Sequence, residues 1–188
     1  MKELSKKMLN MKASSVRKLT KYADEAEARG KKIYKLNIGQ PDLKVPEEYY
    51  QKVREYNEPT IEYMPSKGIP ELLEAVEKFY QGAGINIDQK HIYITTGGTE
   101  AIMFTLLALT NPDDELLIFE PYYSNYNTFF TMTGVKPVAV TTYAENGFHV
   151  ERAAIEEKIT DKTKAIFVTN PGNPTGTVLT EDEIRMIA

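Results

Sequence analysis

The chain has 188 residues, of which 41% are hydrophobic and 27% charged, so it is long enough to build one good hydrophobic core. Its net charge of -4 argues against a nucleic-acid partner, and the lack of cysteine excludes disulfides, thiolate metal sites and a cysteine nucleophile. No apolar window approaches the length of a membrane span, and no apolar run follows the lysine-rich start. We therefore expect a cytoplasmic protein that does not bind a membrane.

The first third of the chain predicts two helices, one short strand and a turn. Apolar residues recur at helical spacing over 15–29, and Gly30 follows as a helix stop. Alternation over 33–38 predicts a strand, which ends at the turn that contains Gly39. A second helix is expected over 46–56.

A proline- and glycine-containing loop over 63–70 precedes a third expected helix. Leu72, Leu73, Val76 and Phe79 are spaced to share one face of that helix. Tyr63 opens the loop, and a lone tyrosine in such a place is most often a packing residue.

The next segment has the pattern of an anion site. A strand is expected over 91–95, and Gly97, Gly98 and Thr99 then lead directly into an apolar helix that ends before Pro112. Exposed amide groups of the glycines and the positive end of the helix dipole favour a phosphate. A plain tight turn would give the same pattern, so the pattern alone leaves both interpretations open.

Short apolar strands then alternate with helices. Strands are expected over 116–119, 138–140 and 165–169, with helices that run to about 131 and over 152–159. This alternation of strands and helices predicts an α/β fold with a mostly parallel, doubly wound sheet. His91 and His149 are the only histidines, and their surroundings predict no metal site.

The most particular stretch is Asn170-Pro171-Gly172-Asn173-Pro174-Thr175-Gly176. Two prolines and two glycines in seven residues predict a rigid turn directly after a strand. The carboxyl ends of strands are where open α/β sheets bind ligands. Asn173 lies inside this turn with an amide that can both donate and accept a hydrogen bond.

At these residues the chain resembles the class I aminotransferases, the aspartate aminotransferase-like enzymes of fold type I that use pyridoxal 5'-phosphate. The resemblance implies a three-layer α/β sandwich and amino transfer between an amino acid and a 2-oxo acid. It implies that Asn173 contacts the cofactor's ring hydroxyl and the substrate carboxylate. It also implies that Gly97, Gly98 and Thr99 hold the cofactor phosphate. Tyr123, two positions after a proline, takes the place of the aromatic residue that stacks on the pyridine ring and lies beside the substrate.

The same resemblance assigns two further residues and a domain division. The backbone of Gly39 would approach the substrate carboxylate, because only glycine has no Cβ in the way. Tyr63 would reach the cofactor phosphate of the partner subunit, which implies a homodimer. Residues 1–45 would form an N-terminal arm, a helix and a small-domain segment, and residues 46–188 the first half of the cofactor-binding large domain.

Three groups that a transaminase needs have no counterpart here by the family pattern. They are the Schiff-base lysine, the acid on the pyridine nitrogen and the arginine that binds the substrate carboxylate. In the family they follow the loop of Asn173. We therefore expect no catalytic residue in this chain, an N-terminal half that is inactive alone, and a truncated sandwich. A capping box from Thr180 to Glu183 starts one more helix near the end.

Several alternatives stay open from the sequence. Fold type I lyases and cyclopropane-forming synthases share these motifs. The chain could also be half of a split enzyme completed by a C-terminal half, or a non-catalytic cofactor-binding or assembly module. Glu74 departs from the arginine that many relatives carry on that helix.

Overall fold

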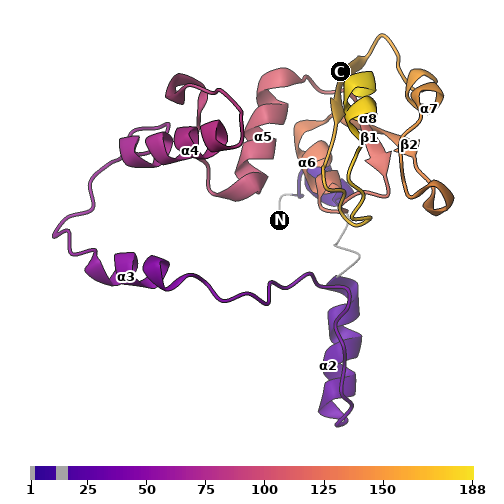
Figure 1. Ribbon diagram of the computed structural model, residues 1–188. Helices are drawn as coiled ribbons and strands as arrows, with labels where there is room; N and C mark the ends of the chain where they lie inside the picture. The colour runs from indigo at the N-terminus through magenta and orange to yellow at the C-terminus, as the bar shows by residue number, and fades with distance from the viewer. Residues whose placement is uncertain (1–2, 12–16) are drawn as a thin grey trace. The chain divides into compact units, whose positions relative to one another are not determined.

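A computed structural model describes residues 3–11 and 17–188, which fall into two compact units (Figure 1). One unit comprises residues 1–34 and 102–188, and the other comprises residues 35–101. The first contains α1 (Lys6–Asn10), the 3-10 helix η1 (Arg17–Leu19) and α2 (Thr20–Ala28), followed later by the sheet and its helices. Ser15 and Val16, where we expected the first long helix to begin, lie outside the described residues.

Three parallel strands form the sheet, in the order β2-β1-β3. These are β1 (Glu115–Glu120), β2 (Lys136–Thr141) and β3 (Thr163–Phe167). The pairing of β1 with β2 runs without interruption from Glu115 opposite Lys136 to Glu120 opposite Thr141. The α/β class and the parallel sheet predicted from the sequence are confirmed.

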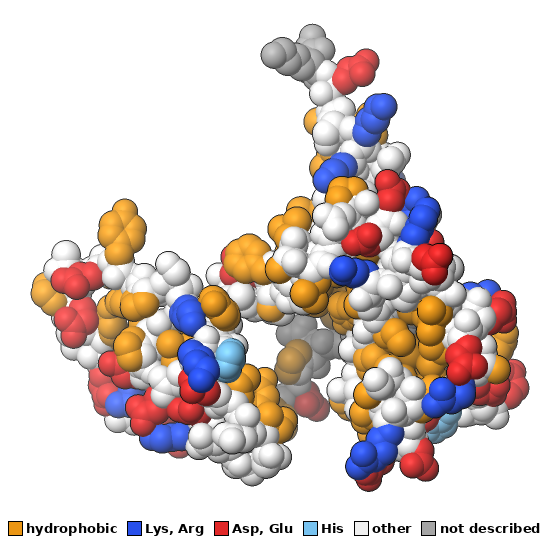
Figure 2. All heavy atoms as spheres, turned by 90° about the horizontal axis from the view of Figure 1, so that it is seen from above, with side chains coloured by type: hydrophobic (Ala, Val, Ile, Leu, Met, Phe, Trp, Pro, Cys, Tyr) orange, Lys and Arg blue, Asp and Glu red, His pale blue; other side chains and the backbone are white. Residues whose placement is uncertain are grey.

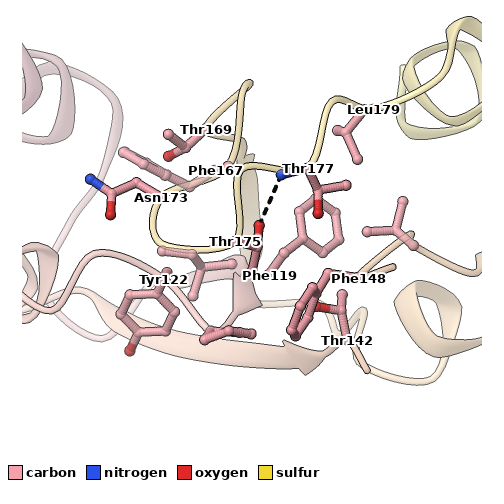
Figure 3. A pocket seen from close by; sticks show the side chains of 14 residues that line it. Phe119, Tyr122, Thr142, Phe148, Phe167, Thr169, Asn173, Thr175, Thr177 and Leu179 are labelled. Carbon is pink, nitrogen blue, oxygen red and sulfur yellow. Dashed lines mark hydrogen bonds between the residues drawn. The ribbon is translucent and has the colours of Figure 1, made fainter. Parts of the chain in front are cut away.

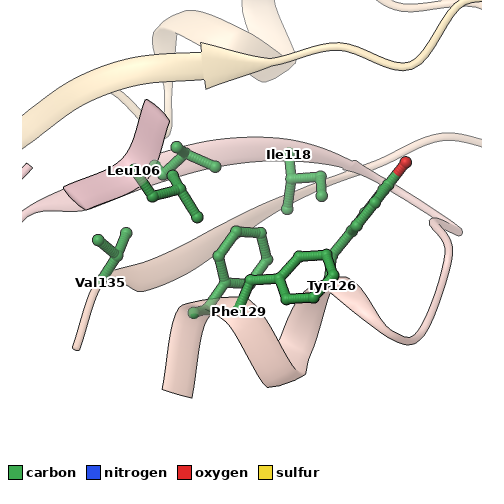
Figure 4. Packing of buried hydrophobic residues seen from close by; sticks show 7 residues of the cluster. Leu106, Ile118, Tyr126, Phe129 and Val135 are labelled. Carbon is green, nitrogen blue, oxygen red and sulfur yellow. The ribbon is translucent and has the colours of Figure 1, made fainter. Parts of the chain in front are cut away.

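Helices cover both faces of the sheet, which makes three layers. The central strand β1 alternates between the faces: Leu116 and Ile118 enter one core cluster and Leu117 enters the other. The first cluster packs against α5 (Gly97–Leu109) and α6 (Tyr126–Thr133) and is shown in Figure 4. The second packs against α7 (Arg152–Glu156) and α8 (Glu181–Ile187). Because helices cover β1 on both faces, its sequence is apolar at four consecutive positions, 116–119, and does not alternate with polar residues.

Local sequence signals explain how several of these helices begin and end. Gly134 ends α6 at a φ of +85°, a left-handed conformation that glycine adopts without strain. The predicted capping box is present: Thr180 Oγ1 accepts from the Glu183 amide, and the Glu183 carboxylate accepts from the Thr180 amide. The 3-10 helix η3 (Ala144–Asn146) ends in the same way at Gly147.

The second unit is helical and contains α3 (Glu47–Glu55), α4 (Pro70–Gly82) and the 3-10 helix η2 (Gln89–His91). The expected helices over 46–56 and from residue 70 are therefore present. The helix α5 begins in this unit at Gly97 and continues into the first unit from Ile102. No helix among residues 3–11 and 17–188 is long and apolar enough to cross a membrane.

Two predicted strands are wrong. Neither 33–38 nor 91–95 is a strand, and no described residues pair with either segment in a ladder. Ile94 makes a single backbone hydrogen bond, from its amide to Lys67 O at 2.8 Å. Alternating apolar residues favour an extended backbone, but a strand also needs a neighbour whose carbonyl and amide groups complete the ladder.

Apolar side chains remain on the surface of both units (Figure 2). The helix α5 is apolar on nearly all sides, and Phe104, Leu107 and Leu109 are each more than half exposed. A helix of this composition is typical of a position covered on all sides by protein. The surface of α5 is therefore suited to pack against further polypeptide.

Candidate functional site

The loop that follows β3 is tied together by its own hydrogen bonds. Gly172 N donates to Thr177 O and Gly176 N donates to Gly172 O, both at 2.8 Å. Asn170 Oδ1 accepts from Leu179 N at 3.0 Å, which joins the start of the loop to its end. A Cβ on Gly172 would lie 2.5 Å from Thr175 Oγ1, so this position accepts only glycine without a shift. The rigid turn expected around Asn173 is thus present in the structure.

Asn173 presents its amide at the carboxyl end of the sheet (Figure 3). The residue is exposed, and among the described residues its side chain has no hydrogen-bond partner. It borders a shallow hollow, open to solvent, whose walls come from the ends of all three strands, including Phe119, Thr142 and Thr169. A fixed backbone with an uncommitted amide is an arrangement that can bind a polar ligand.

Tyr123 lies in the loop between β1 and α6, and the structure connects this loop to that of Asn173. Tyr123 packs edge-on against Tyr126, with 5.4 Å between the ring centroids and an angle of 89°. The hydroxyl of Tyr126 is 3.1 Å from Thr169 Oγ1, at the start of the Asn173 loop. Asn125 Nδ2 donates to the Tyr123 hydroxyl at 2.6 Å, which orients the ring. Tyr123 is 38% exposed, so part of its surface remains available for a ligand.

Tyr122, the residue before Tyr123, lines the hollow. Its hydroxyl donates to Asn127 Oδ1 at 3.0 Å, and its ring stacks on Tyr126 at 6.5 Å. Burial, and then the nearby Glu120 carboxylate, raise the pKa of Tyr122 above its ordinary value. The phenol therefore stays neutral at physiological pH and donates its hydrogen bond.

Gly97, Gly98 and Thr99 form the first turn of α5, in the other unit. Gly97 has a φ of +79°, and its amide donates to Thr95 O. Among the described residues, the Gly98 and Thr99 amides have no partner, and a Cβ on Gly98 would meet nothing within 4 Å. Free amides, open space and the positive end of a 13-residue helix fit a phosphate group.

The carboxylate of Glu100, the residue after Thr99, lies at the same helix end. Glu100 Oε2 accepts from Thr96 N at 2.6 Å. This bond satisfies one amide next to the turn but places a negative charge beside the candidate anion site. An anion bound there would be repelled by Glu100 while the amides attract it.

The loop of Tyr63 is fixed within the same unit by a close glycine contact. Gly68 has a φ of +120°, and a Cβ there would lie 2.5 Å from Ile94 Cγ1. The backbone bond from Ile94 to Lys67 joins the same two segments, so the Tyr63 loop is bound to the segment that leads into the glycine turn. Tyr63 itself is fully exposed.

Gly39 is exposed in the 35–46 segment, which has no regular structure, and a Cβ there would meet nothing within 4 Å. Among the predicted residues, the structure connects the loops of Tyr123 and Asn173. Gly39, Tyr63, Gly97, Gly98 and Thr99 belong to the other unit and are described with it alone.

The Asn173 loop is also anchored at its far end. Thr177 Oγ1 donates to Gly147 O at 2.8 Å, and the 149–150 segment is held in turn by Glu183, the acid of the capping box. Burial would raise the pKa of Glu183, but hydrogen bonds from Thr180, Val150 and His149 lower it to about 2. His149 therefore has a structural contact, 3.0 Å from Glu183 Oε2. The described residues contain no group of three or more histidine, aspartate or glutamate side chains that could hold a metal.

Comparison with known proteins identifies the family. The sequence model for "Aminotransferase class I and II" matches residues 31–188, which is most of the chain. The chain belongs to the class I and II aminotransferase family. The resemblance seen at Asn173 and the glycine turn is thereby confirmed.

Two curated aminotransferases illustrate the relationship. The chain is 34% identical to the probable aspartate/prephenate aminotransferase of Thermus aquaticus, over 100% of this chain and 50% of that protein. It is 37% identical to aromatic-amino-acid aminotransferase 2 of Thermococcus litoralis, over 98% of this chain and 47% of that protein. The chain thus spans about half the length of the curated aminotransferases it matches.

Solved aminotransferase structures confirm the fold. The alanine aminotransferase from Pyrococcus furiosus is similar with a TM-score of 0.89 and 33% identity, over 98% of this chain and 48% of that chain. An aspartate aminotransferase variant from Thermus thermophilus gives a TM-score of 0.87 at 30% identity, over 99% and 49% of the two chains. The three-layer arrangement is therefore that of the aminotransferase fold.

Sequence reasoning missed the residues that support the site. Tyr126, Thr169 and Thr177 are ordinary in the sequence, and only their contacts distinguish them. The tyrosine cluster around Tyr123 was a signal that could have indicated Tyr126, because closely spaced tyrosines often pack on one another.

Proposed function

We propose that this aminotransferase-family chain supplies part of the site of a pyridoxal 5'-phosphate-dependent transaminase of the aspartate aminotransferase type. The observation that carries the proposal is Asn173: its loop backbone is fixed at the carboxyl end of a parallel sheet, and its side-chain amide has no hydrogen-bond partner among the described residues (Figure 3). The substrates would be an amino acid and a 2-oxo acid.

The residues present fit the cofactor by their chemistry. Gly98 and Thr99 offer free amides for the phosphate, at the end of α5 where Gly97 makes the turn. Tyr123 offers a partly exposed aromatic face for the pyridine ring, and Asn173 an amide for the ring oxygen. The cofactor, when bound, supplies an electron sink for the substrate's α-carbon. The chain's residues bind and orient; they move no proton.

Substrate contacts are proposed at three residues. The Asn173 amide can donate to the substrate carboxylate. The family resemblance assigns the Gly39 backbone to a carboxylate contact as well, and glycine has no Cβ that would block it. Tyr123 would lie beside the bound substrate. Tyr63 would contact the cofactor phosphate in the partner subunit of a homodimer, and its complete exposure suits that role.

We further propose that the 188-residue chain alone is inactive, because none of its lysines matches the family's cofactor-linked lysine. The exposed surface of α5 supports association with further polypeptide, which could be a complementing C-terminal half. We also propose that residues 1–45 and 46–188 are the two structural divisions of this chain, and that the protein is cytoplasmic.

Cofactor binding to the purified chain tests the proposal. Pyridoxine 5'-phosphate is a suitable probe in titration calorimetry because it has no aldehyde to react with surface lysines. We expect Asn173→Ala to weaken its binding about tenfold, the effect of one hydrogen bond to a polar ring oxygen, without a change in the free energy of unfolding. Asn57→Ala, which truncates another exposed amide, should bind like the unmodified chain.

Two results would contradict the proposal. One is an unmodified chain that does not bind the probe, or an Asn173→Ala variant that binds it equally well. The other concerns activity: measurable transamination by the purified chain would show that the chain contains the base.

A further inference from the structure

Tyr126 connects two loops that carry candidate cofactor residues. It is the first residue of α6, and only 9% of its surface is exposed. Its ring is perpendicular to that of Tyr123, with 5.4 Å between the centroids, and is tilted against Phe167, the last residue of β3, at 4.8 Å. Its position within the core cluster is shown in Figure 4.

The hydroxyl of Tyr126 makes the polar part of this connection. It forms a hydrogen bond with Thr169 Oγ1 at 3.1 Å, across 43 residues of sequence. Thr169 is followed directly by Asn170, whose side chain closes the Asn173 loop onto Leu179. A side chain that is packed on three sides has few rotamers to choose from, so the bond fixes where the loop leaves the sheet.

We propose that Tyr126 is a positioning residue for the cofactor ring: its ring sets the plane of Tyr123 and its hydroxyl sets the start of the Asn173 loop. The inference rests on the proposed cofactor site. Stacking and hydrogen bonding to one ring both need the two groups in a fixed mutual geometry. Tyr126 provides this geometry without touching the cofactor itself.

The test measures cofactor affinity and stability separately. The chain has no tryptophan, so Tyr123→Trp places a single, selectively excitable tryptophan at the stacking position, and the quenching of its emission by pyridoxine 5'-phosphate reports binding. In this background Tyr126→Phe keeps the ring and removes only the hydroxyl. We expect its Kd to rise about fivefold, as for the loss of one hydrogen bond.

Thr169 provides the other half of the measurement. Thr169→Val, which loses the same hydrogen bond, should raise the Kd by a similar factor, and the double variant should bind no more weakly than either single variant. Thr169→Ser retains the hydroxyl and should restore affinity. Thr133→Val is the matched control, because it removes a buried hydroxyl that bonds to Phe129 O within the same helix. We expect it to lower the free energy of unfolding and leave the Kd unchanged.

Each outcome decides a different point. If Tyr126→Phe behaves like Thr133→Val, with lower stability and an unchanged Kd, Tyr126 has only a structural role and the inference is overturned. If the effects of Tyr126→Phe and Thr169→Val add, the two hydroxyls act separately and the inference also fails. If the unmodified chain binds the probe in calorimetry and the Tyr123→Trp chain does not, the variants at Tyr126, Thr169 and Thr133 are compared by calorimetry in the unmodified background, with the same expected changes in Kd. If the unmodified chain does not bind the probe either, both this inference and the proposed cofactor site are overturned.

Discussion

The buried carboxylate of Glu183 allows a quantitative prediction. It accepts hydrogen bonds from the amides of Thr180 and Val150, at 2.7 and 2.8 Å, and from the Thr180 hydroxyl at 2.8 Å, and it faces His149. These bonds join the start of α8 to the 149–150 segment. We expect Glu183→Gln, which keeps the shape and removes the charge, to destabilise the fold.

The magnitude follows from the pKa. Burial opposes ionisation, but the hydrogen bonds lower the pKa of Glu183 from 4.5 to about 2. At about 1.4 kcal/mol per pKa unit, the ionised form contributes about 3 kcal/mol to the free energy of unfolding. Because the folded-state pKa is the lower one, this contribution is complete above pH 4.5. It is lost progressively as the pH falls from 4.5 toward 2.

Urea unfolding followed by circular dichroism, at several pH values between 7 and 2.5, measures both effects. Glu183→Gln should lose about 3 kcal/mol at pH 7 and show a weaker decline in stability below pH 4.5 than the unmodified chain. Glu181→Gln is the control, since that carboxylate lies on the same helix but is 77% exposed in its pair with Arg185. Equal stability of Glu183→Gln and the unmodified chain at pH 7, or parallel pH curves, would refute the reasoning.

Two further substitutions test other parts of the structure. Gly172→Ala should lower the free energy of unfolding by about 1–2 kcal/mol, because the new Cβ would meet Thr175 Oγ1 at 2.5 Å. Gly82→Ala, where a Cβ meets nothing within 4 Å, should not destabilise the fold. Equal urea midpoints for both variants would contradict this prediction. Glu100→Gln should strengthen binding of pyridoxine 5'-phosphate roughly two- to fivefold, because it removes a like charge from the amino end of α5 and keeps an acceptor for Thr96 N. An unchanged or weaker affinity in calorimetry would show that Glu100 does not affect the anion site.

The sequence by itself determined the features that depend on neighbouring residues. The capping box at Thr180, the stop at Gly134 and the apolar run of β1 each follow from residues within a few positions of one another. The turn around Asn173 is of the same kind, because proline and glycine restrict or release the backbone where they stand. The family was also recognisable at this level, since its motifs are short and local.

Only the tertiary structure decided which distant groups meet. The segments at 33–38 and 91–95 have strand-like alternation, yet they are not strands, because no described segment supplies the partner that a ladder requires. The hydrogen bond between Tyr126 and Thr169 and the contacts of Glu183 with the 149–150 segment join residues more than 30 positions apart. Such contacts depend on how the sheet and helices pack, and no local pattern specifies them.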